Sequence, residues 1–237
     1  MSERVRHLVS RGSRGLRRRG ADRTSGRNFV PATLLGLVLL SGVGCADRER
    51  LPLTPEEFTA RGWENYSAGE LDRAVEDFGR AIGIDGGFGP AYVGLGWAQL
   101  GLAMSPSEMG TAAATFGTAA ASQSGPEVDA GRAAAELGAG DLAAAVTYAQ
   151  AARSEGSFTF AHRPSIDTTD LFLIEAFAFA AQGQFEDALA AADAAPVTDS
   201  GITAADSGSW QVDGTSYPTF ESAVLAFLHQ LSEEYAG

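Results

Sequence analysis

The sequence has no lysine, a single cysteine and three histidines among its 237 residues. The lone cysteine, Cys45, excludes an internal disulfide, and with so few histidines we expect no zinc or other metal site. A permanent membrane-spanning helix needs about 20 predominantly apolar residues. The one long apolar run, from Phe29 to Gly44, has only 16 residues and contains a proline and three glycines. It is too short for a stable span and needs another explanation.

Charge divides the chain into two unlike segments. Residues 1–28 carry nine arginines against two acidic residues, a balance of +7. Residues 45–237 carry the other eight arginines and 28 acidic residues, a balance of −20. Segments of such opposite charge are expected to have different structures and roles, so we treat them separately. The acidic part has no basic stripe that could meet phosphates, so we expect no nucleic-acid partner.

An arginine-rich start, an apolar run and then small residues form the layout of a secretory signal. We therefore predict a signal peptide over residues 1–44 and export of the remainder to the cell envelope. The stretch "SGVGC" resembles a bacterial lipobox, although Gly42 stands where that family usually has leucine. The resemblance implies that Cys45 is lipidated and that residues 45–53 are a short membrane tether. Ordinary cleavage after Ala46 is the alternative, and it would remove the cysteine.

Helix-start signals are frequent after the tether. Thr54 with Glu57 three residues later has the form of a capping box, with a proline in the first turn between them. The motif "SPSE" at residues 105–108 repeats the pattern, and Asp167 or Thr168 ahead of an acidic residue is a weaker version. No window alternates as a half-buried strand does. We therefore predict an all-α protein.

Internal repetition is visible in one dipeptide. Gly62–Trp63 recurs as Gly96–Trp97, 34 residues later, and 34 residues is the period of tetratricopeptide repeats. The four places of the family's first-helix pattern, W-x2-L-G-x2-Y, are occupied in "AYVGLGWAQLG" by Tyr92, Leu95, Gly96 and Gln99. Its second-helix pattern, A-x3-F-x2-A, is matched or approximated by Ala74–Phe78–Ala81, Ala112–Phe116–Ala119, Ala145–Ala149–Ala152 and Ala188–Ala192–Ala195.

The chain thus resembles bacterial lipoproteins that carry tetratricopeptide repeats, over residues 54–196. The resemblance implies a right-handed superhelix of about four antiparallel helix hairpins. Beyond it, residues 197–217 are polar and predict a loop holding Trp210. Residues 218–237 predict an amphipathic helix that covers the last repeat, as the end of a solenoid requires for solubility.

In this family the first helices line a concave groove that holds peptides or partner helices. Carried over by alignment, the residues facing that groove are Thr59, Trp63, Tyr66, Val93, Trp97, Leu100 and Phe177. Large aromatic side chains are common binding anchors. They also dominate cores, so packing against the neighbouring hairpin is an equal alternative for Trp63 and Trp97.

These features favour a lipid-anchored adaptor for a protein or peptide partner, itself membrane-associated because the tether is short. We expect no cofactor and no catalytic centre, and the oligomeric state stays open. The alternative is a small periplasmic enzyme or ligand-capture protein built on the connector at residues 158–170. There His162 would act as a base with Asp167 or Asp170.

Overall fold

The computed structural model describes residues 53–196 and 199–235, all of which belong to one compact unit. The predicted signal peptide, Cys45 and the tether up to residue 52 lie outside these residues, so those predictions stay predictions. Within the described residues, no helix combines the length and apolar character needed to cross a membrane.

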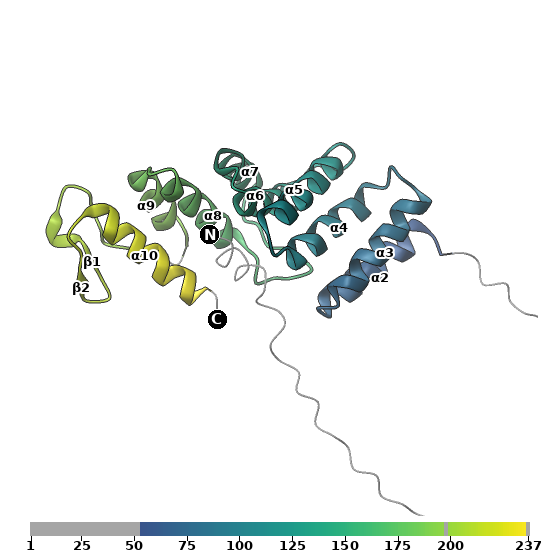
Figure 1. The fold of residues 1–237 in the computed structure, drawn as a ribbon, viewed down its shortest axis with the longest axis horizontal. Helices are drawn as coiled ribbons and strands as arrows, with labels where there is room; N and C mark the ends of the chain where they lie inside the picture. Colours follow the sequence, from purple (N-terminus) through teal and green to yellow (C-terminus); the bar gives the residue numbers. More distant parts are fainter. Residues whose placement is uncertain (1–52, 197–198, 236–237) are drawn as a thin grey trace, which may run out of the picture. The chain divides into compact units, whose positions relative to one another are not determined.

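The described part of the chain contains nine α-helices, and each of the first eight packs against the next along the chain (Figure 1). They form four hairpins, α2/α3, α4/α5, α6/α7 and α8/α9, and α10 follows. This confirms the predicted all-α array of helical hairpins. The helices are α2 (Pro55–Ser67), α3 (Leu71–Ile84), α4 (Gly89–Leu102), α5 (Pro106–Ala120), α6 (Pro126–Ala139), α7 (Leu142–Ser154), α8 (Thr168–Ala181), α9 (Phe185–Asp193) and α10 (Phe220–Glu234).

The predicted helix starts are present. The Thr54 hydroxyl accepts from the Glu57 amide at 3.3 Å, and the Glu57 carboxylate accepts from the Thr54 amide at 2.9 Å, which completes a capping box. Asp167 caps α8 in the same reciprocal way. Ser105 caps α5, but this cap is not reciprocal. The Glu108 carboxylate accepts from the Met104 amide and the Ser105 hydroxyl, and not from the Ser105 amide. These bonds satisfy amides that a helix start leaves without partners.

The seam between the first two hairpins is built around Phe78 of α3, which is fully buried. Its ring lies between Gly62 of α2 and Gly94 of α4. A Cβ atom at either glycine would lie under 3.0 Å from ring atoms of Phe78. The glycines therefore make room for the ring, which accounts physically for the first glycine of the repeated dipeptide.

Phe116 of α5 repeats this arrangement one hairpin later. Gly96 of α4 and Gly131 of α6 face its ring, again too closely for a Cβ atom. The third and fourth second helices carry alanine in the place of phenylalanine, and Ala149 and Ala192 are both fully buried. Large side chains in that part of the core include Leu171, Leu173 and Ile174, which α8 buries.

Two buried carboxylates join neighbouring helices. Asp77 of α3 accepts from Arg61 and Asn65 of α2. Glu175 of α8 accepts from the Nε of Arg153 of α7 at 2.8 Å. Each buried charge is thus paired, as burial of an ionised group requires.

The segment predicted as a polar loop contains more structure than expected. Residues Ser207–Ser209 form a 3-10 turn, and β1 (Gln211–Val212) pairs antiparallel with β2 (Thr215–Ser216). Asp213 and Gly214 join the two strands with φ of +49° and +76°. Asp-Gly is a favoured two-residue hairpin turn, so the signal was present but the strands were too short to show a period. Trp210 is half-buried, and its Nε1 donates to a loop carbonyl at 2.9 Å.

The last helix, α10, packs against α9, α8 and β1. It buries an apolar stripe that includes Phe220, Val224, Leu228 and Leu231. These side chains cover the apolar surface that α9 would otherwise leave open, which is the role predicted for the terminal helix.

Candidate partner-binding site

The residues between α7 and α8, 156–167, form what we call the connector loop. The loop leaves the end of α7 and extends back toward α4 (Figure 1). Gly156 has φ of +119°, a conformation that favours glycine, and it redirects the chain out of α7. Thr159 and Asp167 then form an antiparallel bridge.

The connector loop is closed by hydrogen bonds within itself. The Phe160 amide donates to the Ile166 carbonyl at 2.9 Å, and the Arg163 amide donates to the Phe160 carbonyl at 3.1 Å. At its base, the Thr168 amide donates to the Phe158 carbonyl at 3.0 Å. The loop therefore has a defined shape of its own.

Beneath the connector loop lies an aromatic floor, which we define as Trp63 and Tyr66 of α2 and Trp97 of α4. The i, i+3 spacing brings Trp63 and Tyr66 together on one face of α2, with ring centroids 5.5 Å apart. Phe160 of the loop stacks on Trp97, with centroids 4.1 Å apart and planes 18° apart. It also meets Tyr66 edge-on at 5.8 Å. Phe160 is only 1% exposed.

His162 and Arg163 extend this contact across the floor. The His162 imidazole stacks on Trp63 with centroids 3.8 Å apart and planes 1° apart. The Arg163 guanidinium lies over the Tyr66 ring, 5.2 Å from its centroid. Burial lowers the pKa of His162, which favours the neutral imidazole in this position.

The groove predicted from the resemblance is not open. Tyr66, Val93, Trp97 and Leu100 are 1–2% exposed and belong to the core. Thr59 is also buried, while Trp63 and Phe177 are half-buried. The expectation of an exposed aromatic groove is therefore corrected. Trp97 packs edge-on against Phe116 of α5, which belongs to its own hairpin and not to the neighbouring hairpin that the packing alternative named, and the connector loop covers the floor.

Three polar atoms near the floor are buried with no hydrogen-bond partner among the described residues: Thr59 Oγ1, Tyr66 Oη and Trp97 Nε1. Thr59 lies one helical turn before Trp63 on the same face of α2. Burial raises the pKa of Tyr66 to about 12, which keeps its hydroxyl protonated and able to donate. Unpaired buried polar groups are uncommon, and each one costs free energy.

Of the connector-loop residues that contact the floor, Phe160 and Arg163 were not among the predicted site residues, and His162 was predicted only as the base of the catalytic alternative. A signal existed in the connector sequence "SFTFAHRPSI". It contains two phenylalanines and a histidine at every second position, which is unusual in a surface connection. Sequence alone could not say that this segment folds back onto α2 and α4.

The structure does not assemble the catalytic alternative. In the described part of the chain, no acidic side chain is hydrogen-bonded or ion-paired to His162. Asp167 and Asp170 are engaged in the cap of α8. No group of three His, Cys, Asp or Glu side chains is placed to hold a metal ion within these residues either.

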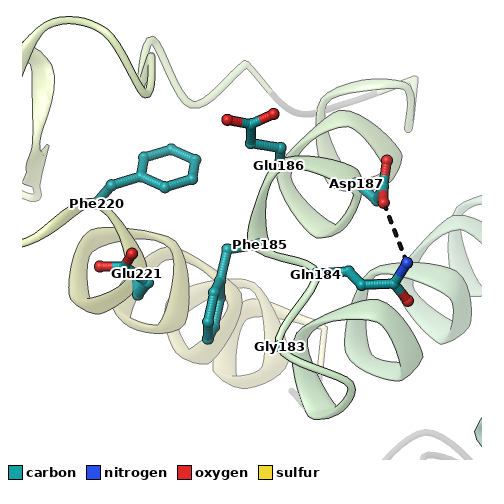
Figure 2. Close-up of a pocket in the computed structure, with 7 residues that line it drawn as sticks. All are labelled: Gly183, Gln184, Phe185, Glu186, Asp187, Phe220 and Glu221. Atoms are coloured by element: carbon teal, nitrogen blue, oxygen red, sulfur yellow. Dashed lines mark hydrogen bonds between the residues drawn. The ribbon is translucent and has the colours of Figure 1, made fainter.

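A pocket of about 360 Å³ lies between the starts of α9 and α10 (Figure 2). Phe185 and Phe220 supply its apolar lining, and Glu186, Asp187 and Glu221 surround them. Asp187 accepts a 3.4 Å hydrogen bond from Gln184. The carboxylates lie apart from one another in Figure 2 and do not converge on one point, so the pocket lacks a built ligand site.

No protein-family model matches this chain, and a comparison with curated proteins finds no match.

Proposed function

We propose that this protein is a membrane-tethered adaptor of the cell envelope that binds a segment of a partner protein on the face formed by α2 and α4. One observation carries the proposal: this face already holds a peptide segment, the connector loop, by ring-to-ring contacts with Trp63 and Trp97. Arrays of helical hairpins present such extended surfaces because each hairpin adds a further strip of side chains.

Charge supports a preference among partners. The chain after residue 44 has a balance of −20, so association with basic segments is favoured by long-range steering. The short predicted tether would hold the array close to the bilayer. Partners that are themselves at the membrane would then meet it at high effective concentration.

Site-specific photo-crosslinking in intact cells tests this proposal. A photoreactive residue is placed in the full chain at Ser67, which is exposed at the end of α2 one helical turn after Trp63, or at Glu76, which is exposed on α3. We expect a discrete crosslinked partner in the envelope fraction from position 67 and none from position 76. An absence of any partner at position 67, with the protein correctly localised, would contradict the adaptor proposal.

A further inference from the structure

We propose that the connector loop is a displaceable occupant of the aromatic floor, and that the true ligand is a partner segment with two flat rings two residues apart followed by an arginine. This inference rests on the proposed adaptor function and deepens it by stating the chemistry of the partner.

The first argument is that the loop is held by its rings and shaped by its own backbone. Phe160 stacks on Trp97 and His162 stacks on Trp63, while the backbone bonds of Phe160 and Ile166 run within the loop. These contacts depend on the geometry of the rings themselves and need no hydrogen bond between the backbone of the loop and the floor. A segment from elsewhere could present the same rings.

The second argument is that the loop is an incomplete ligand. Tyr66 Oη, Trp97 Nε1 and Thr59 Oγ1 stay buried without partners while the loop is in place. Two of these groups belong to side chains that Phe160 contacts directly. A partner segment whose backbone carbonyls accept from the Tyr66 hydroxyl or the Trp97 indole would satisfy groups that the loop leaves unpaired, and it would therefore compete favourably.

The third argument concerns charge. Arg163 lies over the Tyr66 ring, and the charges of Arg163 and Glu127 both act on the Tyr66 hydroxyl. Glu127 lies in the first turn of α6 and is itself partly buried, and burial raises the pKa of its carboxyl. A cation at the position of Arg163 is therefore complementary to this edge of the floor, whereas an acidic residue there would be repelled.

The arrangement predicts competition between the loop and an added peptide. The loop is part of the same chain, so it occupies the floor at high effective concentration. A free peptide binds only the fraction of molecules in which the loop has left, so its apparent affinity is reduced by that fraction. Weakening the loop should raise the affinity of the peptide without any change to the floor.

A binding experiment with the full chain in detergent micelles tests this. The probe is a fluorescein-labelled peptide of sequence SFTFAHRPSI, and the control peptide has serine in place of both phenylalanines. We compare the wild-type protein with Phe160→Ala/His162→Ala, which removes the two rings that stack on tryptophans. The probe should bind the variant at least about tenfold more tightly than it binds wild type, and the control peptide should bind neither.

Because Phe160 is a core residue, a milder variant guards against loss of fold. His162→Ala/Arg163→Ala removes two half-buried contacts and retains Phe160. It should remain helical by circular dichroism and still bind the probe more tightly than wild type. If this folded variant gains no affinity, the loop is a fixed part of the core and the inference is overturned.

Displacement has its own signature in wild type. In isotope-labelled protein, the His162 ring protons experience the ring current of Trp63 because the two rings are parallel at 3.8 Å. Saturation with unlabelled probe should move these signals to the positions of an unstacked histidine. Binding that leaves them unchanged would show that the peptide sits elsewhere, which also overturns the inference.

The outcome separates this inference from the adaptor proposal. A probe that fails to compete, together with a partner crosslinked at position 67, would support the adaptor and contradict the displaceable loop. A probe that displaces the loop, without any crosslinked partner in cells, would leave a peptide-binding floor and remove the adaptor.

Discussion

At the scale of single residues, the volumes of the glycine and phenylalanine side chains explain why these residues recur from one hairpin to the next. Phe78 fills the space between two hairpins only because Gly62 and Gly94 present no side chain to it. A closely packed ring that is enclosed by helices has little room to move aside. An additional methyl group beside it would therefore strain the native structure. Glycine is a poor helix former, but at these two positions it stabilises the protein because it leaves space for the ring.

We predict that Gly94→Ala destabilises the protein by about 1–3 kcal/mol, because the new methyl group would overlap the Phe78 ring. The matched control is Gly79→Ala on the exposed side of α3, where a Cβ atom meets nothing within 4 Å. This control should be neutral or stabilise by up to about 1 kcal/mol, because alanine is the better helix former. Denaturant unfolding followed by circular dichroism measures both, and equal effects would contradict the volume argument.

His162 gives the second residue-scale prediction, a dependence of stability on pH. Burial lowers its pKa from an ordinary value of 6.5, so the folded state prefers the neutral imidazole. The contribution of His162 to stability is then fully present above pH 6.5. It is lost as the pH falls from 6.5 toward the lowered pKa, because the unfolded chain takes up the proton first.

The measurement compares the free energy of unfolding of wild type and His162→Phe from about pH 8 to about pH 5. The phenylalanine keeps a flat ring against Trp63 but does not titrate. The difference in stability between the two proteins should move in favour of the variant as the pH falls. A difference that stays constant over this range would show that the stack does not depend on the charge of His162.

At the scale of elements, neighbouring hairpins are joined by ion pairs as well as by apolar seams. Glu175 of α8 is buried, with 4% of its side chain exposed, and accepts from Arg153 and Gln150 of α7. Its partner Arg153 also lies over the Phe172 ring, 3.9 Å from the centroid. The contact holds α7 and α8 together at the point where the connector loop leaves the array.

We predict that Glu175→Ala destabilises the protein by at most about 3–5 kcal/mol, because it leaves a partly buried arginine without its carboxylate. The loss should fall below the upper end of that range because Arg153 keeps 23% of its side chain exposed. The control is Glu76→Ala, which removes the exposed ion pair with Arg80 within α3 and should cost about 1 kcal/mol or less. Thermal and denaturant unfolding measure the stability of both variants. Similar losses of stability would contradict the inference that Glu175 holds α7 and α8 together.

At the scale of the whole molecule, the proposed adaptor depends on a segment outside the described residues. The basic, apolar and small-residue sequence of positions 1–44 predicts export, and Cys45 is the predicted site of lipid attachment. A single acyl chain binds membranes weakly, whereas two or more give a stable anchor. A lipidated cysteine with several chains would therefore keep an acidic array at the membrane surface.

We predict that Cys45→Ser moves the exported protein from the membrane fraction to the soluble fraction, since serine cannot carry the thioether-linked lipid. The measurement is fractionation of cells, combined with mass spectrometry of the mature N-terminus. No other thiol can take over the attachment, because Cys45 is the only cysteine in the sequence. A soluble wild-type protein that begins after Ala46 would instead establish ordinary signal cleavage.

The sequence by itself determined the helical class, the number of hairpins and the starts of α2, α5 and α8. These depend on local signals: the capping pairs Thr54–Glu57 and Asp167–Asp170, and glycines and phenylalanines at repeat spacing. Such signals act over three or four residues or recur at a fixed period, so they can be read along the chain.

Only the tertiary structure decided what lies against the aromatic floor. The contact between Phe160 and Trp97 joins residues 63 positions apart, and that between His162 and Trp63 joins residues 99 positions apart. Neither follows a periodic pattern, because the connector loop is unique in the chain and its path depends on the packing of four hairpins. For the same reason the sequence could place tryptophans on the correct helices but could not show that the chain itself covers them.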